Sequence, residues 1–248
     1  MKLSTQTIAL TAIFASLYYV LSLITPHVPA IGIPEIVISL EALIASVFGL
    51  VLGPYLGALA AFTGASITWI ISGMSPHGLP FLLSPPLNAL TVGLLYYRKW
   101  KLAFATLGLL ILVFVFLPPS QPLWENSNVA VAVLWDKVIA LLLIFPSVKF
   151  AKHLSSTEKL PILYFLLAFI GNQTDNMWGS DIFAVPIVYE GIFGAPLDFV
   201  RSAFLVSPFV YPAIRLMQAL FATIIAVPLM AALKNTGWAF SEKTILSP

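Results

Sequence analysis

The sequence predicts an all-α protein, a polytopic bundle of transmembrane helices that forms one domain over residues 1–248. The chain is 60% hydrophobic and only 9% charged, whereas a soluble domain carries about a quarter charged residues. Apolar runs of about twenty residues, the length that crosses the hydrocarbon core of a bilayer, recur along the whole chain. This composition excludes a water-soluble globular domain.

We expect eight membrane spans, several of them bounded by Pro or Gly, where helices stop; they cover residues 5–24, 36–52, 55–72, 79–97, 102–117, 129–145, 160–177 and 209–233. The first is read as a span and not as a cleaved signal peptide, because its apolar stretch exceeds the roughly 7–15 residues of a secretory core. The segment 179–208 is apolar but broken by prolines and glycines. We expect it to form half-helices or a lid at the outer face, against protein or a water-filled cavity.

The basic residues set the orientation of these spans. Connections on one side carry Lys2, Arg98, Lys99, Lys101, Lys149, Lys152, Lys159, Lys234 and Lys243. The opposite connections, 25–35, 73–78 and 118–128, contain no Lys or Arg. By the positive-inside rule, both termini are cytoplasmic in a cell membrane. The acidic residues Glu35, Glu125, Asp181, Glu190 and Asp198 then collect outside.

Ionisable and amide side chains inside the spans form the candidate binding site, since each costs several kcal/mol there unless it is paired or hydrated. In the predicted topology the charged ones lie in the outer half of the membrane, and the densest cluster is GNQTDNMW at 171–178. The candidate substrate-binding residues are Glu41, Trp69, Asn88, Trp135, Asp136, Lys137, Asn172, Gln173, Asp175, Asn176, Trp178, Arg215 and Gln218. Aromatic walls with a few fixed polar groups are typical of small-molecule sites. The alternatives are a purely structural network of ion pairs and, for each aromatic residue, anchoring at headgroup depth.

Small residues recur every fourth position at Gly53, Gly57, Ala61 and Ala65. A smooth face of this kind lets another helix approach closely in lipid, so these residues are candidates for partner docking. Ordinary packing within the bundle is the alternative explanation.

Several other chemistries lack support in the sequence. The absence of cysteine excludes disulfides and thiolate sites. His27 and His77 fall near Glu35 and Glu41 in the chain, but without the spacing of a ligand motif. We therefore expect no metal and no cofactor. An intramembrane enzyme stays an alternative through a carboxylate pair of Asp136 and Asp175, although the chain has no HExxH or GxSxG motif.

The first span, ALTAIFASLYYVLS, and the stretch IGIPEIVISLEALIASVFGLVLGPYLGALAAFTGA carry a family resemblance. They resemble the N-terminal half of the S components, the substrate-capture subunits of energy-coupling factor (ECF) transporters, over roughly residues 5–75. The resemblance implies a six-helix core, a lid at 25–35 and a small-residue docking motif on the first helix. The nearest equivalents of that motif are Thr11-xxx-Ala15 and Ala12-xxx-Ser16. The chain departs from the family pattern in length, by two further spans or by re-entrant segments.

The resemblance implies a membrane subunit that captures a vitamin or related micronutrient from outside. The chain has no GxxxxGK[ST] motif, so uptake would need a transmembrane coupling subunit and two ATPases. A stand-alone secondary transporter of a small polar solute is the alternative, although we find no internal repeat of the kind such folds show. The ligand's charge stays open, because Lys137 and Arg215 suit a carboxylate whereas Glu41 and Asp175 suit a cation.

Overall fold

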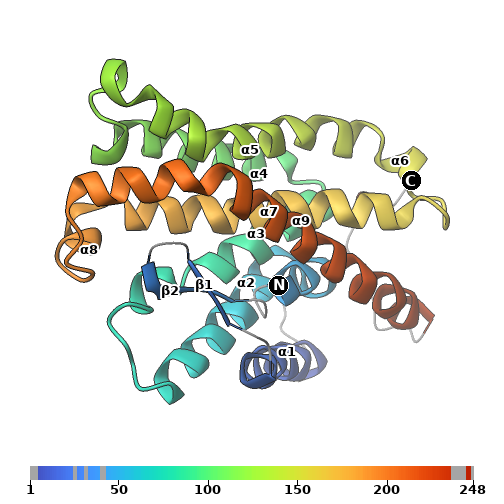
Figure 1. The fold of residues 1–248 in the computed structure, drawn as a ribbon. Helices are drawn as coiled ribbons and strands as arrows, with labels where there is room; N and C mark the ends of the chain where they lie inside the picture. Colours follow the sequence, from blue (N-terminus) through green and yellow to red (C-terminus); the bar gives the residue numbers. More distant parts are fainter. Residues whose placement is uncertain (1–4, 25–26, 31–32, 40–42, 236–243, 247–248) are drawn as a thin grey trace.

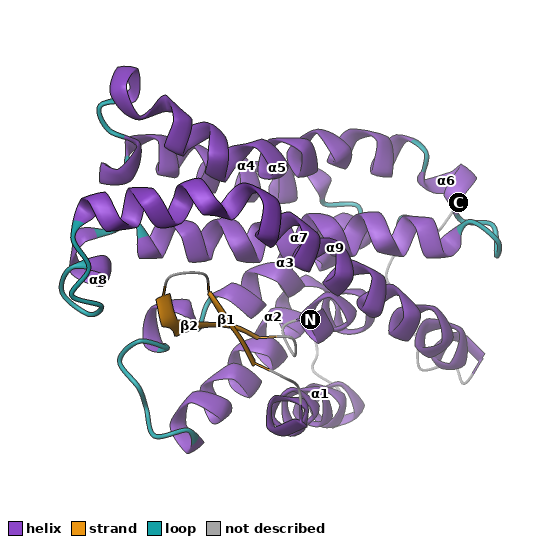
Figure 2. Cartoon of the chain, viewed as in Figure 1, coloured by secondary structure: helices purple, strands orange, loops and turns teal. Residues whose placement is uncertain are grey.

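Long helices packed side by side make up nearly all of the molecule, with one short β-hairpin at the edge of the bundle (Figures 1 and 2). The computed structural model describes residues 5–24, 27–30, 33–39, 43–235 and 244–246. The elements are α1 (Thr5–Ile24), β1 (His27–Ala30), β2 (Ile33–Ser39), α2 (Leu43–Ile71), η2 (Leu79–Phe81), α3 (Ser84–Tyr96), α4 (Trp100–Phe116), η3 (Pro118–Ser120), α5 (Leu123–Lys149), α6 (Ala151–Leu154), α7 (Leu160–Phe183), α8 (Pro186–Tyr189) and α9 (Leu197–Asn235).

The helices confirm a polytopic membrane bundle. Within the described residues, five helical segments are long and apolar enough to cross a membrane by length and composition: α1, α2, η2 with α3, α5, and residues 208–235 of α9. The helix α4 is apolar but shorter. The helix α7 runs through the bundle with nearly all of residues 167–177 buried, so protein rather than lipid surrounds its polar cluster.

The helix α2 is a helical hairpin that turns at Gly53. Gly53 has φ 79° and ψ 179°, a backbone conformation that favours glycine, and Pro54 follows it. A Cβ added to Gly57 would lie 2.7 Å from the carbonyl oxygen of Phe48, so the two parts of α2 pack back to back. The predicted spans 36–52 and 55–72 therefore correspond to the two parts of one element.

Two predicted boundaries differ from the structure. The span predicted from residue 36 begins as a helix only at Leu43, because Ile33–Ser39 pairs with His27–Ala30 as an antiparallel hairpin. The residues of β2 are rich in Ile and Val, which favour strands. At about 1.5 Å per residue, residues 43–52 span only about half of a hydrocarbon core. The last helix begins at Leu197 rather than residue 209, so much of the segment 179–208 is helical.

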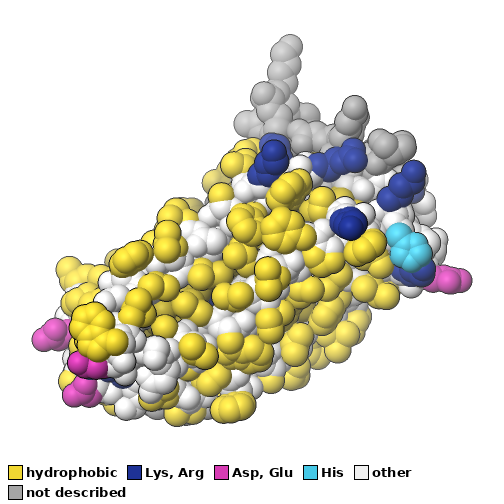
Figure 3. All heavy atoms as spheres, turned by 90° about the horizontal axis from the view of Figure 1, so that it is seen from above, with side chains coloured by type: hydrophobic (Ala, Val, Ile, Leu, Met, Phe, Trp, Pro, Cys, Tyr) yellow, Lys and Arg dark blue, Asp and Glu magenta, His cyan; other side chains and the backbone are white. Residues whose placement is uncertain are grey.

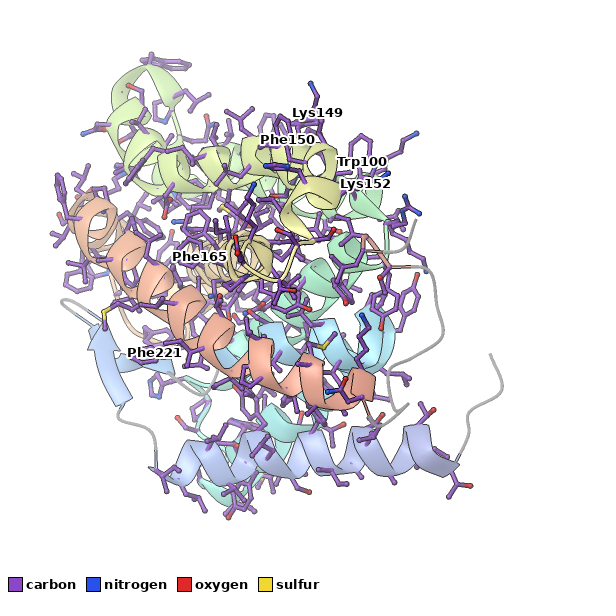
Figure 4. The ribbon with its side chains drawn as sticks, turned by 90° about the vertical axis from the view of Figure 1, so that its right-hand side faces the viewer. Trp100, Lys149, Phe150, Lys152, Phe165 and Phe221 are labelled. Carbon is purple, nitrogen blue, oxygen red and sulfur yellow. The ribbon has the colours of Figure 1, made fainter. Side chains whose placement is uncertain are left out.

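Charged residues separate to the two ends of the bundle, with an apolar surface between them. Figure 3 shows most Lys and Arg side chains at one end and most Glu and Asp side chains at the other. The basic end holds the α3–α4 connection and the α5–α7 connection, with Arg98, Lys99, Lys149 and Lys152 exposed. Figure 4 looks onto this end and shows Lys149 extending away from the helices. This separation agrees with the predicted division of the connections by charge.

Candidate functional site

Polar side chains from α5, α7 and α9 are buried together inside the bundle. The exposed fraction is 2% for Asp136, 4% for Asp175 and 8% for Arg215. The further buried polar residues of the predicted site are Asn88, Lys137, Asn172, Gln173, Asn176 and Gln218. Because such groups are rarely left inside a bundle without a partner, their contacts decide what the site can do.

The helices α7 and α9 are joined by an ion pair. Arg215 Nη2 lies 3.4 Å from Asp175 Oδ1, and Arg215 Nη1 donates a hydrogen bond of 2.9 Å to Gln218 Oε1. Residues three apart share one helical face, so α9 presents Arg215 and Gln218 together. The second carboxylate oxygen of Asp175 and the Nε of Arg215 have no hydrogen-bond partner.

A second ion pair lies within α5. Lys137 Nζ is 2.9 Å from Asp136 Oδ1, and the backbone N–H of Lys137 donates to the same oxygen at 3.0 Å. The other oxygen, Asp136 Oδ2, is buried without a partner. Both carboxylates are thus held by cations, and the described residues show no hydrogen bond that would join Asp136 to Asp175 as a catalytic pair.

A chain of amide and hydroxyl groups links α2, α3 and α7. Ser46 Oγ donates to Asn88 Oδ1 at 2.8 Å, and Asn88 Nδ2 donates to Asn172 Oδ1 at 2.8 Å. Gly171 permits this close approach, since a Cβ there would collide with the side chains of Asn88 and Val92. These bonds give Asn88 a structural role between α2 and α7; its role in substrate binding stays a prediction.

Buried polar atoms without partners surround these contacts. Within the described residues, both amide atoms of the fully buried Gln173 are unpaired, as are Asn172 Nδ2, Asn176 Nδ2 and Thr91 Oγ1. Donors and acceptors are thus both available for a bound molecule or for water. The described residues hold no group of three or more His, Cys, Asp or Glu placed to bind a metal ion.

The predicted tryptophans occupy different places. Trp178 Nε1 donates to the carbonyl of Pro80 at 3.2 Å, so it fastens the C-terminal part of α7 to η2. Trp69 Nε1 donates to the carbonyl of Ser75 at 2.7 Å. Trp135 is 41% exposed, whereas its neighbour Asp136 is buried. This exposure favours the anchoring role for Trp135, which we leave out of the proposed site. The predicted Glu41 lies outside the described residues.

Two charged residues, Asp181 and Arg201, and two buried hydroxyl groups were not predicted as part of the interior. Asp181 is buried, although we expected it only among the outside acids. Arg201 donates to the backbone carbonyls of Gln121, at 2.7 Å, and Pro119, at 3.4 Å, and thereby anchors α9 to the α4–α5 connection. Ser46 and Thr91 are buried as well, and single hydroxyls in apolar runs gave no sequence signal.

The predicted docking residues divide between interior and surface. Gly53, Gly57, Ala61 and Ala65 are all buried, and Gly57 lies against the backbone of the other part of α2. Packing within the bundle, the alternative explanation, therefore accounts for this stripe, and it offers no free docking face.

The small residues of α1 remain partly available. Ala15 is buried against α2. A Cβ added to Gly64 of α2 would lie 2.8 Å from the carbonyl oxygen of Ala15. Thr11 is half-buried and donates to the carbonyl of Thr7 at 2.8 Å. Ala12 and Ser16 are exposed on the opposite side of α1.

Comparison with known proteins confirms the family resemblance. Residues 2–117 match the family model described as the S component of the ECF-type riboflavin transporter. The match extends past the resemblance at 5–75 to the end of α4, and it leaves out α5, α7 and α9. No curated protein and no solved structure matches the chain.

Proposed function

From this relationship to the S components, we propose that the protein is the membrane-embedded substrate-binding subunit of an ECF-type importer. It captures a vitamin or related small micronutrient from the outside. The family-model match over residues 2–117 carries this proposal. The basic end of the bundle (Figure 3) faces the cytoplasm by the positive-inside rule.

The buried cluster on α5, α7 and α9 is the proposed binding site. It supplies buried, unpaired donors and acceptors, among them Gln173, Asp175 and Arg215. A ligand that satisfies these atoms gains more than the same contacts would give in water, because leaving them unmade costs about 1–3 kcal/mol each.

The matched family is described as a riboflavin transporter component, which makes riboflavin the first compound to test. Most of the proposed site lies beyond residue 117, in α5, α7 and α9. The substrate therefore does not follow from the match, and we propose only a vitamin-like solute.

The proposed partners of the protein are a transmembrane coupling subunit and two ATPase subunits. The exposed face of α1 with Ala12 and Ser16 is the proposed contact for the coupling subunit, since small side chains allow close helix approach in lipid. The protein would then move substrate only when it is assembled with an ATPase module.

The test has two parts. Native mass spectrometry of the gently purified protein should reveal a co-purified small molecule, and added riboflavin should be followed by quenching of its fluorescence. Gln173→Leu should abolish or strongly weaken binding of whichever compound is found, because neither amide atom of Gln173 has a partner within the described protein. Thr106→Val, which alters a half-buried hydroxyl of α4, is the control and should bind normally.

Reconstitution in proteoliposomes then tests the coupling. Uptake of the bound compound should require the coupling subunit and ATP hydrolysis. Uptake by this chain alone would instead identify a secondary transporter.

A further inference from the structure

Asp181 is a buried carboxylate without a partner. It lies near the outer end of α7, its residue is only 5% exposed, and neither Oδ1 nor Oδ2 has a hydrogen-bond partner. No cation among the described residues forms an ion pair with it. The ionised form of a carboxyl group in this condition is costly, and a cation beside it would stabilise that form.

The charges of the described interior balance everywhere except at Asp181. Lys137 pairs with Asp136, and Arg215 pairs with Asp175. These four side chains carry no net charge as two ion pairs. Asp181 is therefore the buried group whose charge the described chain leaves uncompensated.

Asp181 lies on the helix that also carries much of the central polar cluster. It follows Asp175 by six residues, which places it about 9 Å further along the axis and about 120° around the helix. A ligand in contact with both residues therefore extends around α7 as well as along it. Nearby on α7, Phe183 packs against Phe193 of the α8–α9 connection, with ring centroids 5.5 Å apart, so aromatic side chains close this end of the bundle.

We infer that Asp181 is a second polar position of the substrate site, one that pairs with a cationic or amino group of the substrate. This inference rests on the proposed function. It narrows the substrate class to molecules that bear a protonated amine or a ring cation. The remainder of such a molecule would contact the buried polar cluster of α5, α7 and α9, in which each charged side chain has a partner.

Binding of four probes to the purified full chain tests the inference. Pyridoxamine and pyridoxine share one ring and differ by an aminomethyl against a hydroxymethyl group; thiamine is a ring cation, and riboflavin is uncharged. At least one of the two cationic probes should bind the wild type. Asp181→Asn should weaken that binding about tenfold or more, as expected for loss of a charge-assisted contact. Asp198→Asn, the same change at an exposed carboxylate of α9, should leave it unchanged.

Three results would overturn the inference: neither cationic probe binds, the only bound probes are uncharged, or a cation binds Asp181→Asn as tightly as the wild type. If that variant does not fold, a preference of the wild type for pyridoxamine over pyridoxine decides the question. If riboflavin is the only probe that binds, and binds the wild type and the variant equally, the result contradicts the inference but supports the proposed function. A protein that binds no probe and carries no co-purified molecule would count against both.

Discussion

Arg215 on α9 lies 3.4 Å from Asp175 on α7, and both residues are buried. The pair therefore ties the last helix of the chain to the helix that carries the polar cluster. Neither residue falls within the segment 2–117 that matches the S-component family. The helices α7 and α9, which lie outside the matched segment, are thus fastened to each other at the proposed binding site.

Arg215→Met should destabilise the protein by about 3 kcal/mol or more, because it leaves Asp175 as a buried charge without its partner. Thermal unfolding in detergent measures the effect. The double variant Asp175→Leu with Arg215→Met should recover most of the stability, since apolar side chains of similar volume replace the whole pair. A double variant as unstable as the single one would show that the unpaired charge of Asp175 is not the cause of the lost stability.

The turn in α2 depends on close contact at Gly57. A methyl group at this position would meet the carbonyl oxygen of Phe48 at 2.7 Å and the amide nitrogen of Gly49 at 3.0 Å. Gly57→Ala should therefore separate the two parts of the hairpin and destabilise the protein by about 1–3 kcal/mol. Gly108→Ala on α4 is the matched control, because its nearest neighbour would be Leu141 Cδ1 at an ordinary 3.9 Å. Equal melting temperatures for the two variants would contradict the prediction.

The sequence was sufficient to predict the membrane class and most helices, because apolar run length follows directly from bilayer thickness. The start of α2 was missed at Leu43. The Ile- and Val-rich residues of β2 are as apolar as a span, so hydropathy alone does not separate strand from helix there. The sequence did not decide whether Gly57 contacts a partner protein or packs within the bundle. A stripe of small residues has the same spacing in both cases.

The sequence predicted which charged residues belong to the candidate site, but not which of them form ion pairs with each other. Charges inside apolar runs identified Asp136, Lys137, Asp175 and Arg215, and the structure buries all four. Which carboxylate each cation meets depends on helix rotation, which sequence periodicity does not fix. Asp181 was misjudged for a related reason: the helix α7 continues to Phe183, six residues beyond the predicted end of its span.

Arg201 anchors the first turns of α9. Its guanidinium donates hydrogen bonds to two backbone carbonyls of the α4–α5 connection, those of Gln121 and Pro119. Arg201→Ala should destabilise the protein by about 1–3 kcal/mol, since hydrogen bonds that involve a charged group are the stronger ones. Increased hydrogen–deuterium exchange over residues 197–207 would accompany the loss. Lys152→Ala, at an exposed position of α6, should change neither measurement, and an unaltered exchange pattern in the Arg201 variant would disprove the anchoring role.

The exposed face of α1 gives a separate prediction about assembly. Ala12→Leu places a large side chain on the side of α1 away from α2, where Ala12 is exposed, so the fold and substrate binding should stay intact. Close approach of a coupling helix would be blocked, and affinity for the coupling subunit should fall about tenfold or more, which corresponds to about 1.4 kcal/mol. Co-purification with the coupling subunit and ATPases, alongside ligand binding by the free protein, separates the two effects. Ala105→Leu on the exposed side of α4 is the control, and loss of assembly in both variants, or in neither, would rule out this face of α1 as the specific contact.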